Sequence, residues 1–371
     1  MILKEGQKTA KYIFSSSQFQ PTSQSSLSVN EDHRNQCVHE ITPVTQELHF
    51  TFSFLKTVFF FFSDVMSFFL SITAFTIVAE IALGSFANVF ILLVNCTDCI
   101  KRRKISSADR ILTGLATFRV GMLSVILVSW CFTVFKLALS LQATVGICVG
   151  WAVTNHFSTW LSTVLSIFYL LKIGSFSNPI FLGLKANIKS VVVVVLWGSL
   201  VLLFPNLTMA SIFEAILVNE DRGNLTGKTK LAYVINLTAK MAFTLDNVIP
   251  FTISMICFLL LIYSLCKHLR TMKLYGKGYQ DPSALAHIKA LQAVISFLLL
   301  FSLFILSLII SGFNNTKSLD EPVYLICYVF GTLYPSNHSF ILIWGNKRIK
   351  QAFVLVMVQV KAKLWVREQK P

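Results

Sequence analysis

The chain has few charged side chains, and acidic ones are the scarcest. Of its 371 residues only 13% are charged, with 17 Asp and Glu against 32 Lys and Arg, whereas 54% are hydrophobic. Soluble domains carry about a quarter charged residues, so this composition excludes an ordinary water-soluble protein and predicts an all-α membrane protein. In so apolar a chain, the net charge of +15 indicates membrane topology and contact with membrane lipid, and no nucleic-acid partner is predicted.

Motifs for catalysis and metal binding are also missing. The sequence has no His/Glu zinc motif, no Ser/His/Asp order and no glycine-rich phosphate loop in an accessible position, so it predicts neither an enzyme nor a cofactor. The eight cysteines show no framework of disulfides, and Cys96 and Cys99 form one C-x-x-C pair without a second pair or a nearby His. A bound metal is therefore not expected.

Long hydrophobic runs are what the chain has in abundance. Seven of them follow Met66 at regular intervals, and each is long enough to cross a hydrocarbon core of about 30 Å as a helix. They lie at about 68–94, 111–131, 144–171, 191–213, 241–266, 291–313 and 322–344. The sequence thus predicts three parts: a disordered N-terminal extension 1–65, a seven-transmembrane helix bundle 66–344 and a cytoplasmic tail 345–371.

The distribution of Lys and Arg predicts which side of the membrane each loop faces. With the N-terminus outside, the inner loops and the tail hold 20 Lys and Arg, and the outer loops hold 6. Because cytoplasmic loops are enriched in these residues, the N-terminus is predicted to be extracellular. Two glycosylation patterns, at Asn224 and Asn236, fall in the longest outer loop. The tail has the spacing of a short amphipathic helix along the inner leaflet, through Ile349, Phe353, Val356, Val360 and Leu364.

Polar side chains inside the spans are the candidate functional residues, because each costs free energy in hydrocarbon unless a partner or water satisfies it. Arg119 lies about 16 Å into the second span. It is predicted to be either a state-dependent polar hub, with Asn88 as a partner, or a fixed structural residue. In the third span, one helical face carries Trp151, Asn155, Ser158, Thr159 and Ser162. That face is predicted to line a cavity open to the outer side, and helix–helix packing is the alternative.

Several longer motifs stand in or beside the predicted spans. They include Leu112-Thr-Gly-Leu-Ala-Thr-Phe-Arg119, Trp151-Ala-Val-Thr-Asn-His156, Phe176-Ser-Asn-Pro-Ile-Phe-Leu-Gly-Leu-Lys185 and His338-Ser-Phe-Ile-Leu-Ile343. On these motifs the chain from about Met66 to Lys370 resembles the type 2 taste receptors, which are the bitter receptors among G-protein-coupled receptors. It differs from the large rhodopsin-like branch, because Phe168-Tyr-Leu-Leu-Lys172 stands where that branch has Asp-Arg-Tyr.

The resemblance implies a function and the residues that carry it. It implies that bitter small molecules bind from the outer side against Trp151 and Asn155, with Phe304 of the sixth span opposite, and Ser158 and Thr159 belong to the same face. It also implies a gustducin-like heterotrimeric G protein at the inner side. The residues predicted for coupling or switching are Arg119, Lys172, His268, His287 and His338. The alternative function is a membrane transporter or channel, which requires inverted repeats or rings of embedded charge.

Overall fold

The computed structural model describes residues 68–102, 105–135, 140–221, 229–274, 282–313 and 321–368. The chain divides into two units, Met1–Ser67 and Phe68–Pro371, and the described residues all belong to the second. The predicted extension 1–65 therefore lies outside the described residues. Helices make up the described part, without a strand: Phe68–Ile100, α3 (Ser107–Val134), α4 (Leu141–Ile173), α5 (Pro179–Ala186), α6 (Ile188–Asp221), α7 (Thr229–Leu274), α8 (Pro282–Phe313), α9 (Glu321–Gly345) and α10 (Lys347–Glu368).

Most of the long helices are apolar enough to cross a membrane. Within the described residues, five stretches meet the requirements of length and hydropathy: Phe68–Ile100, Ser107–Val134, Ile188–Thr208, Leu237–Met272 and His287–Gly312. They coincide with the first, second, fourth, fifth and sixth predicted spans. The other two predicted spans fall in α4 (33 residues) and α9 (25 residues), which also are continuous helices but contain more polar side chains. A helical membrane protein is thus confirmed.

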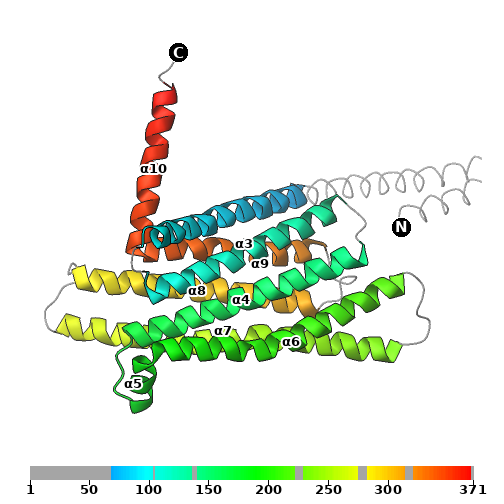
Figure 1. The fold of residues 1–371 in the computed structure, drawn as a ribbon, viewed down its shortest axis with the longest axis horizontal. Coiled ribbons are helices and arrows are strands. Elements are labelled where there is room, and N and C mark those ends of the chain that lie inside the picture. Colours follow the sequence, from blue (N-terminus) through cyan, green and yellow to red (C-terminus); the bar gives the residue numbers. More distant parts are fainter. Residues whose placement is uncertain are drawn as a thin grey trace, which may run out of the picture. The chain divides into compact units, whose positions relative to one another are not determined.

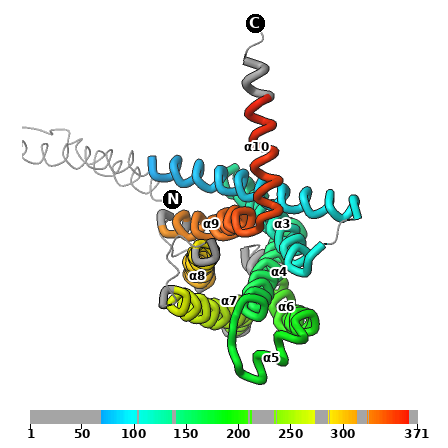
Figure 2. The backbone as a smooth tube through the Cα atoms, turned by 90° about the vertical axis from the view of Figure 1, so that its left-hand side faces the viewer, coloured from blue at the N-terminus to red at the C-terminus, as the bar shows by residue number. Residues whose placement is uncertain are grey.

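The helix α4 packs among its neighbours rather than at the edge of the bundle. It contacts α3, α6 and α7, while α8 contacts α7 and α9 (Figures 1 and 2). Because other helices enclose α4, its polar side chains are shielded from lipid, and the spacing of three and four in the sequence is explained by this burial. The buried polar residues of α4 are Asn155, His156, Ser158, Thr159, Ser162, Thr163 and Ser166.

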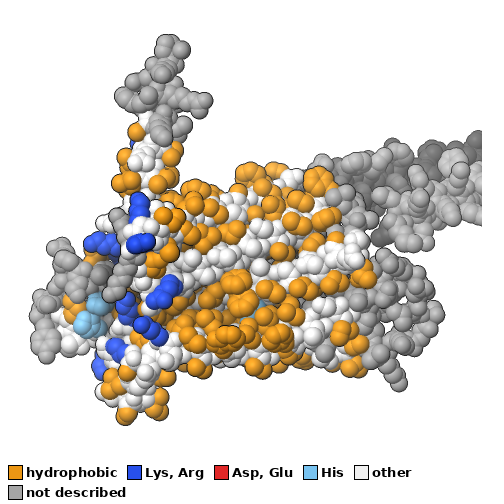
Figure 3. Space-filling view, viewed as in Figure 1, with side chains coloured by type: hydrophobic (Ala, Val, Ile, Leu, Met, Phe, Trp, Pro, Cys, Tyr) orange, Lys and Arg blue, Asp and Glu red, His pale blue; other side chains and the backbone are white. Residues whose placement is uncertain are grey.

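Lys and Arg gather at one end of the bundle. Figure 3 shows them where α4 and α7 end and α8 begins, whereas hydrophobic side chains cover the flank of the helices. We name this region the basic end, and the described Lys and Arg that belong to it are Lys101, Arg102, Arg110, Lys172, Lys185, Lys189, Lys267, Arg270, Lys289, Lys347, Arg348 and Lys350.

The helix α10 leaves the bundle at the basic end and runs nearly perpendicular to α9 (Figures 1 and 2). Its first turn is held by Arg348, whose guanidinium contacts the carboxylates of Asp98, in the 68–100 helix, and Asp109, in α3. The Phe353 ring then packs edge-on against the 68–100 helix. Beyond it the apolar side chains of residues 354–358 and 360 are exposed. The anchored start of α10 is therefore followed by an apolar segment that the described part of the bundle leaves uncovered.

Close approach of the 68–100 helix to α9 depends on Gly84. A Cβ atom at this position would lie 2.7 Å from the Cβ and 2.8 Å from the Cα of Ser336, so a larger residue requires α9 to move. We expect Gly84→Ala to lower the free energy of unfolding by about 1–3 kcal/mol. Thermal denaturation of the purified chain in detergent measures the effect. The matched control is Gly198→Ala, because an added Cβ there meets no heavy atom within 4 Å; equal midpoints for the two variants would contradict the prediction.

Candidate functional site

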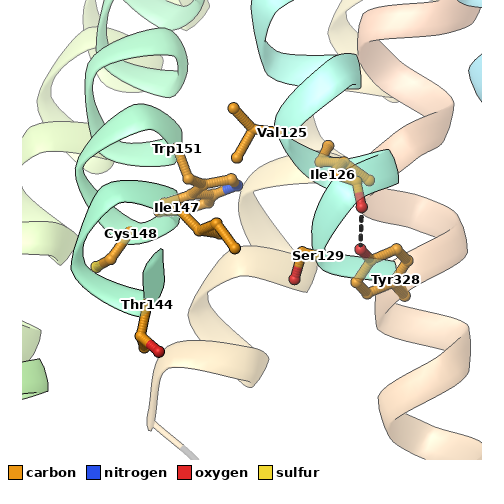
Figure 4. A pocket seen from close by; sticks show the side chains of 8 residues that line it. All are labelled: Val125, Ile126, Ser129, Thr144, Ile147, Cys148, Trp151 and Tyr328. Atoms are coloured by element: carbon orange, nitrogen blue, oxygen red, sulfur yellow. Dashed lines mark hydrogen bonds between the residues drawn. The ribbon is translucent and has the colours of Figure 1, made fainter. Parts of the chain in front are cut away.

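A cavity of about 370 Å³ lies between α3, α4 and α9, in the half of the bundle away from the basic end. We name it the α4 chamber. In Figure 4 the Trp151 ring projects from α4 toward α3, and Tyr328 projects from α9 toward the same helix. The Tyr328 hydroxyl donates a hydrogen bond to the backbone carbonyl of Ile126, at 3.0 Å. The lining residues are Val125, Ile126, Ser129, Thr144, Ile147, Cys148, Trp151 and Tyr328.

A second cavity, of about 190 Å³, extends from the same wall toward α8. We name it the α8 chamber. It shares Ile126, Trp151 and Tyr328 with the α4 chamber, and its other lining residues are Met122, Phe304, Ser307, Leu308, Ser311, Cys327, Gly331 and Thr332. Trp151 and Phe304, predicted from the sequence to face each other across a ligand, therefore line one site. The described lining of both chambers is aromatic and aliphatic with several hydroxyls, and it includes no charged side chain.

The other three residues predicted to bind the ligand, Asn155, Ser158 and Thr159, do not line these chambers. Asn155 is fully buried, and its amide Nδ2 donates to Oδ1 of Asn247 in α7 at 3.0 Å. The Thr159 hydroxyl donates to the backbone carbonyl of Asn155, at 3.0 Å. The hydroxyl of Ser158 is buried without a hydrogen-bond partner among the described atoms. The structure thus places these residues in the interior of the bundle, with Asn155 at the interface between α4 and α7.

Asn155 nevertheless stands one step behind the wall of the α4 chamber. The Asn247 side chain that it contacts donates in turn to the backbone carbonyl of Phe243, at 2.8 Å. The Phe243 ring lies 5.4 Å from the Trp151 ring, centroid to centroid. A series of contacts through α7 therefore joins Asn155 to Trp151.

A buried polar network joins α4, α6 and α7 around Asp246. The carboxylate Oδ1 contacts His156 Nδ1 at 2.6 Å and accepts from Trp160 Nε1 at 3.4 Å, and Oδ2 accepts from Asn206 Nδ2 at 2.9 Å. The other ring nitrogen of His156 contacts the Ser199 hydroxyl at 3.2 Å. His156 and Asp246 are fully buried. The carboxylate is satisfied by three side chains, which explains how an acidic group is tolerated in the bundle interior.

A second network centres on Arg119 in α3, which is fully buried. Its guanidinium donates to Ser339 at 3.2 Å, to Ser162 at 3.4 Å and to Nδ1 of His338 at 2.6 Å, and it lies 4.9 Å from the centroid of the Tyr334 ring. Because arginine is only a donor, Nδ1 of His338 must be the acceptor, so the proton of the neutral ring is on Nε2. The Tyr334 hydroxyl donates to Ser162 at 2.7 Å. We name these five residues the Arg119 cluster.

The suggested pairing of Arg119 with Asn88 is indirect. The Ser339 hydroxyl, which accepts from Arg119, donates to Oδ1 of Asn88 at 2.8 Å. The Asn88 amide donates to the backbone carbonyls of Gly84 and Pro335. Asn88 therefore joins the 68–100 helix to α9, and it connects the Arg119 cluster, whose residues come from α3, α4 and α9, to a fourth helix.

The Arg119 cluster lies between the α8 chamber and a cavity that reaches the basic end. That cavity, of about 160 Å³, lies among α4, α7, α8 and α9, and both Ser162 and His338 line it. On the other side, the Phe304 ring of the α8 chamber stacks on Tyr334 with centroids 4.9 Å apart. The two cavities are thus connected through a continuous set of contacting side chains.

The remaining predicted coupling residues lie at the basic end. Lys172 lies in the last turn of α4 and is exposed, with its ammonium 5.5 Å from the Phe168 ring. His268 of α7 and His287 of α8 contact each other edge to face, with ring centroids 4.7 Å apart. The structure brings the two histidines together but places His338 away from them, in the Arg119 cluster.

Sequence reasoning missed Tyr328 and Asp246. Tyr328 is part of a polar series in α9 that continues through Thr332, Ser336 and Ser339 at spacings of three and four, and this helical period is the signal that could have identified it. For Asp246 the signal is the cost of a carboxylate in hydrocarbon, which requires partners. Its partners come from three helices, so their identity requires the fold.

The predicted glycosylation residues are not described. Asn224 lies in the segment 222–228 outside the described residues, and Asn236 lies in α7 with a side chain that is likewise outside the described set.

Known proteins match the chain over most of its length. The family model described as taste receptor protein (TAS2R) matches residues 37–361. The chain is similar to taste receptor type 2 member 136 of Rattus norvegicus, with 68% identity over 329 residues that cover 89% of this chain and 99% of the relative. Its counterpart in Mus musculus is 63% identical over 307 residues, covering 83% and 100%. Taste receptor type 2 member 31 of Homo sapiens is 50% identical over 296 residues, covering 80% and 95%.

Proposed function

Because the chain belongs to the type 2 taste receptor family of G-protein-coupled receptors, we propose that it detects bitter small molecules in taste perception. The molecules bind in the α4 and α8 chambers, and a heterotrimeric G protein binds at the basic end. The chain is a multi-pass membrane receptor and not an enzyme. The alternative function, a transporter or channel, is set aside because the relatives of this chain are taste receptors.

One observation carries this proposal: the chambers and the basic end are linked through the Arg119 cluster. A molecule in the α8 chamber contacts Phe304, which stacks on Tyr334. Tyr334 shares its Ser162 contact with Arg119, and Arg119 holds His338, which lines the cavity toward the basic end. A ligand that prefers one arrangement of this cluster shifts a pre-existing equilibrium by its differential affinity for the two states.

The membrane topology that fits this function has seven spans and an extracellular N-terminus. The ratio of 20 inner to 6 outer Lys and Arg supports this orientation, as does their gathering at one end (Figure 3). α4 and α9 complete the seven spans, because bundle packing shields the polar side chains that they carry. The proposed parts are an extension 1–65, a bundle 66–344 and a tail 345–371, with Asn224 and Asn236 as glycosylation sites on the outer side.

The proposed partner at the basic end is a gustducin-like G protein. Lys172, His268 and His287 come from the ends of α4, α7 and α8, which surround the cavity toward the basic end. Basic groups of this kind favour an acidic partner surface. Arg119 and His338 act as the switch between the chambers and this surface.

The proposed lipid contact is made by α10. Its exposed apolar segment, residues 354–358 and 360, is flanked by Lys347, Lys350 and Lys361. An apolar segment with basic flanks suits the interface of an anionic inner leaflet. The perpendicular course of α10 relative to α9 (Figure 1) agrees with a helix that lies along the membrane surface.

The binding site is tested by Trp151→Ala. This change removes the ring that lines both chambers and packs on Phe243, so we expect agonist potency to fall at least tenfold, equivalent to about 1.4 kcal/mol of binding free energy. The measurement is calcium release in cells that express the chain with a taste-type G protein, challenged with a panel of bitter compounds. Trp197→Ala is the matched control, because Trp197 is 70% exposed on α6.

Equal potency of the Trp151→Ala and wild-type chains, at equal surface expression and for every active compound, would show that the chambers are not the agonist site. Asn155→Ala separates two roles. If Asn155 only supports the wall of the α4 chamber, Asn155→Ala should lower the potency of all agonists by a similar factor. If Asn155 contacts the bound molecule directly, the substitution should affect some agonists and spare others.

A further inference from the structure

Tyr328 occupies the wall that the two chambers share. Its ring packs against Trp130 of α3 with centroids 5.3 Å apart, and its hydroxyl donates to the carbonyl of Ile126 on the same helix (Figure 4). The side chain therefore reaches across from α9 and is held against α3 at both its ring and its tip. A residue fixed at two points resists rotation more than a ring held by packing alone.

The two shared residues beside it are held differently. Trp151 projects from α4 and packs on Phe243 of α7. Ile126 belongs to α3 itself and supplies the carbonyl that accepts the hydrogen bond. Tyr328 is thus a shared side chain that is held at both its ring and its hydroxyl, between volumes of about 370 and 190 Å³.

We propose that Tyr328 is a partition between the α4 and α8 chambers, and that it limits the size of the molecules that the receptor accepts. The limit on agonist size rests on the proposed function, whereas the partition itself does not. The described lining of both chambers offers aromatic rings, aliphatic side chains and hydroxyls without a charged group. The class of ligand that suits this lining is an uncharged, largely apolar aromatic compound with one or two hydrogen-bonding groups.

Two native cysteines report on the partition from opposite sides. Cys148 lines the α4 chamber and is half-buried, while Cys327 lines the α8 chamber and is 6% exposed. The probe is benzyl methanethiosulfonate, an uncharged aromatic reagent. A cysteine thiolate attacks its sulfenyl sulfur, the bond to the sulfonyl sulfur breaks, and methanesulfinate leaves while a mixed disulfide forms. The thiol proton passes to solvent, so the reaction needs no further reagent.

Labelling rates at each cysteine are measured by peptide mass spectrometry on the purified full chain in detergent. In the wild-type chain we expect Cys148 to be labelled at least tenfold faster than Cys327. Tyr328→Ala should raise the rate at Cys327 at least tenfold and leave the rate at Cys148 within about twofold. Tyr328→Phe keeps the ring but loses the bond to Ile126, so its rate at Cys327 should fall between those of the other two chains.

Cys257 of α7 is the internal control, because it is 8% exposed and lines neither chamber. The decisive quantity is the ratio of the Cys327 rate to the Cys257 rate in the same molecule, which general loosening of the bundle would leave unchanged. A rise of this ratio in both Tyr328 variants supports the partition. A ratio equal to that of the wild-type chain in both variants, or labelling of wild-type Cys327 as fast as Cys148, would overturn it.

The size limit is read separately from signalling. Acetophenone and 2-acetonaphthone, each with one hydrogen-bond acceptor, serve as a graded pair of uncharged probes in the calcium assay, and we expect Tyr328→Ala to increase the response to the naphthyl compound relative to the phenyl compound at least fivefold. A changed labelling ratio with an unchanged order of agonists would overturn the size limit and keep the partition. If the wild-type chain responds to no compound of the panel, that result would count against the proposed function instead.

Discussion

Replacing Arg119 by Lys is expected to reduce agonist potency at least tenfold, and replacing it by Ala to abolish the response. The guanidinium contacts Ser339, Ser162 and His338 at once from a fully buried position, which a single ammonium on a flexible stem cannot reproduce. Each hydrogen bond to a charged group is worth about 1.5–3 kcal/mol, and tenfold in potency corresponds to about 1.4 kcal/mol. Loss of one contact therefore suffices for the effect.

The matched control for Arg119 is Arg110, which lies on the same helix and is exposed. Arg110→Lys should leave potency within about twofold. Calcium release must be normalised to surface expression, because Arg119→Ala also leaves buried acceptors without a donor and should reduce the amount of folded receptor. Wild-type potency of Arg119→Lys at normal surface expression would show that the cluster has a structural role only.

Much of the fold follows from the hydrophobic runs, because a membrane permits little besides helices in a chain of this composition. Predicted spans such as 111–131 and 291–313 fall within α3 and α8. The helices extend beyond the runs, since backbone hydrogen bonding continues into the polar ends. The least apolar predicted spans, in α4 and α9, are those whose polar side chains are buried against other helices. Hydropathy cannot distinguish that burial from exposure to water.

The site was predictable only in part. The helical spacing on α4 indicates which residues share a face, and the structure places Trp151 of that face at a cavity that Phe304 also lines. It does not say how far along the face the cavity extends, because this depends on where α7 packs against α4. Asn155 falls just beyond that point, where Asn247 meets it. The polar series on α9 marks Tyr328 as a residue of an inward face, but the two chambers beside it form only where α9 packs against α3, α4 and α8.

Asp246→Ala is expected to destabilise the folded receptor by about 3 kcal/mol, the lower end of the range for breaking a buried ion pair. The carboxylate satisfies His156, Trp160 and Asn206, so its removal leaves three buried donors without an acceptor. At about 2–4 °C per kcal/mol, the thermal midpoint in detergent should fall by about 6–12 °C. Asp246→Asn should cost less, because the amide oxygen still accepts a hydrogen bond.

A double-mutant cycle with His156→Phe determines whether the loss comes from the pair itself. Both residues are fully buried, and His156 Nδ1 lies 2.6 Å from Asp246 Oδ1. Removing either one leaves the other without this short contact, whereas removing both eliminates that penalty. The double variant should therefore be more stable than the sum of the two single effects predicts, by about 1–3 kcal/mol. Strict additivity would mean that His156 and Asp246 stabilise α4, α6 and α7 independently, through Ser199 and Asn206 respectively.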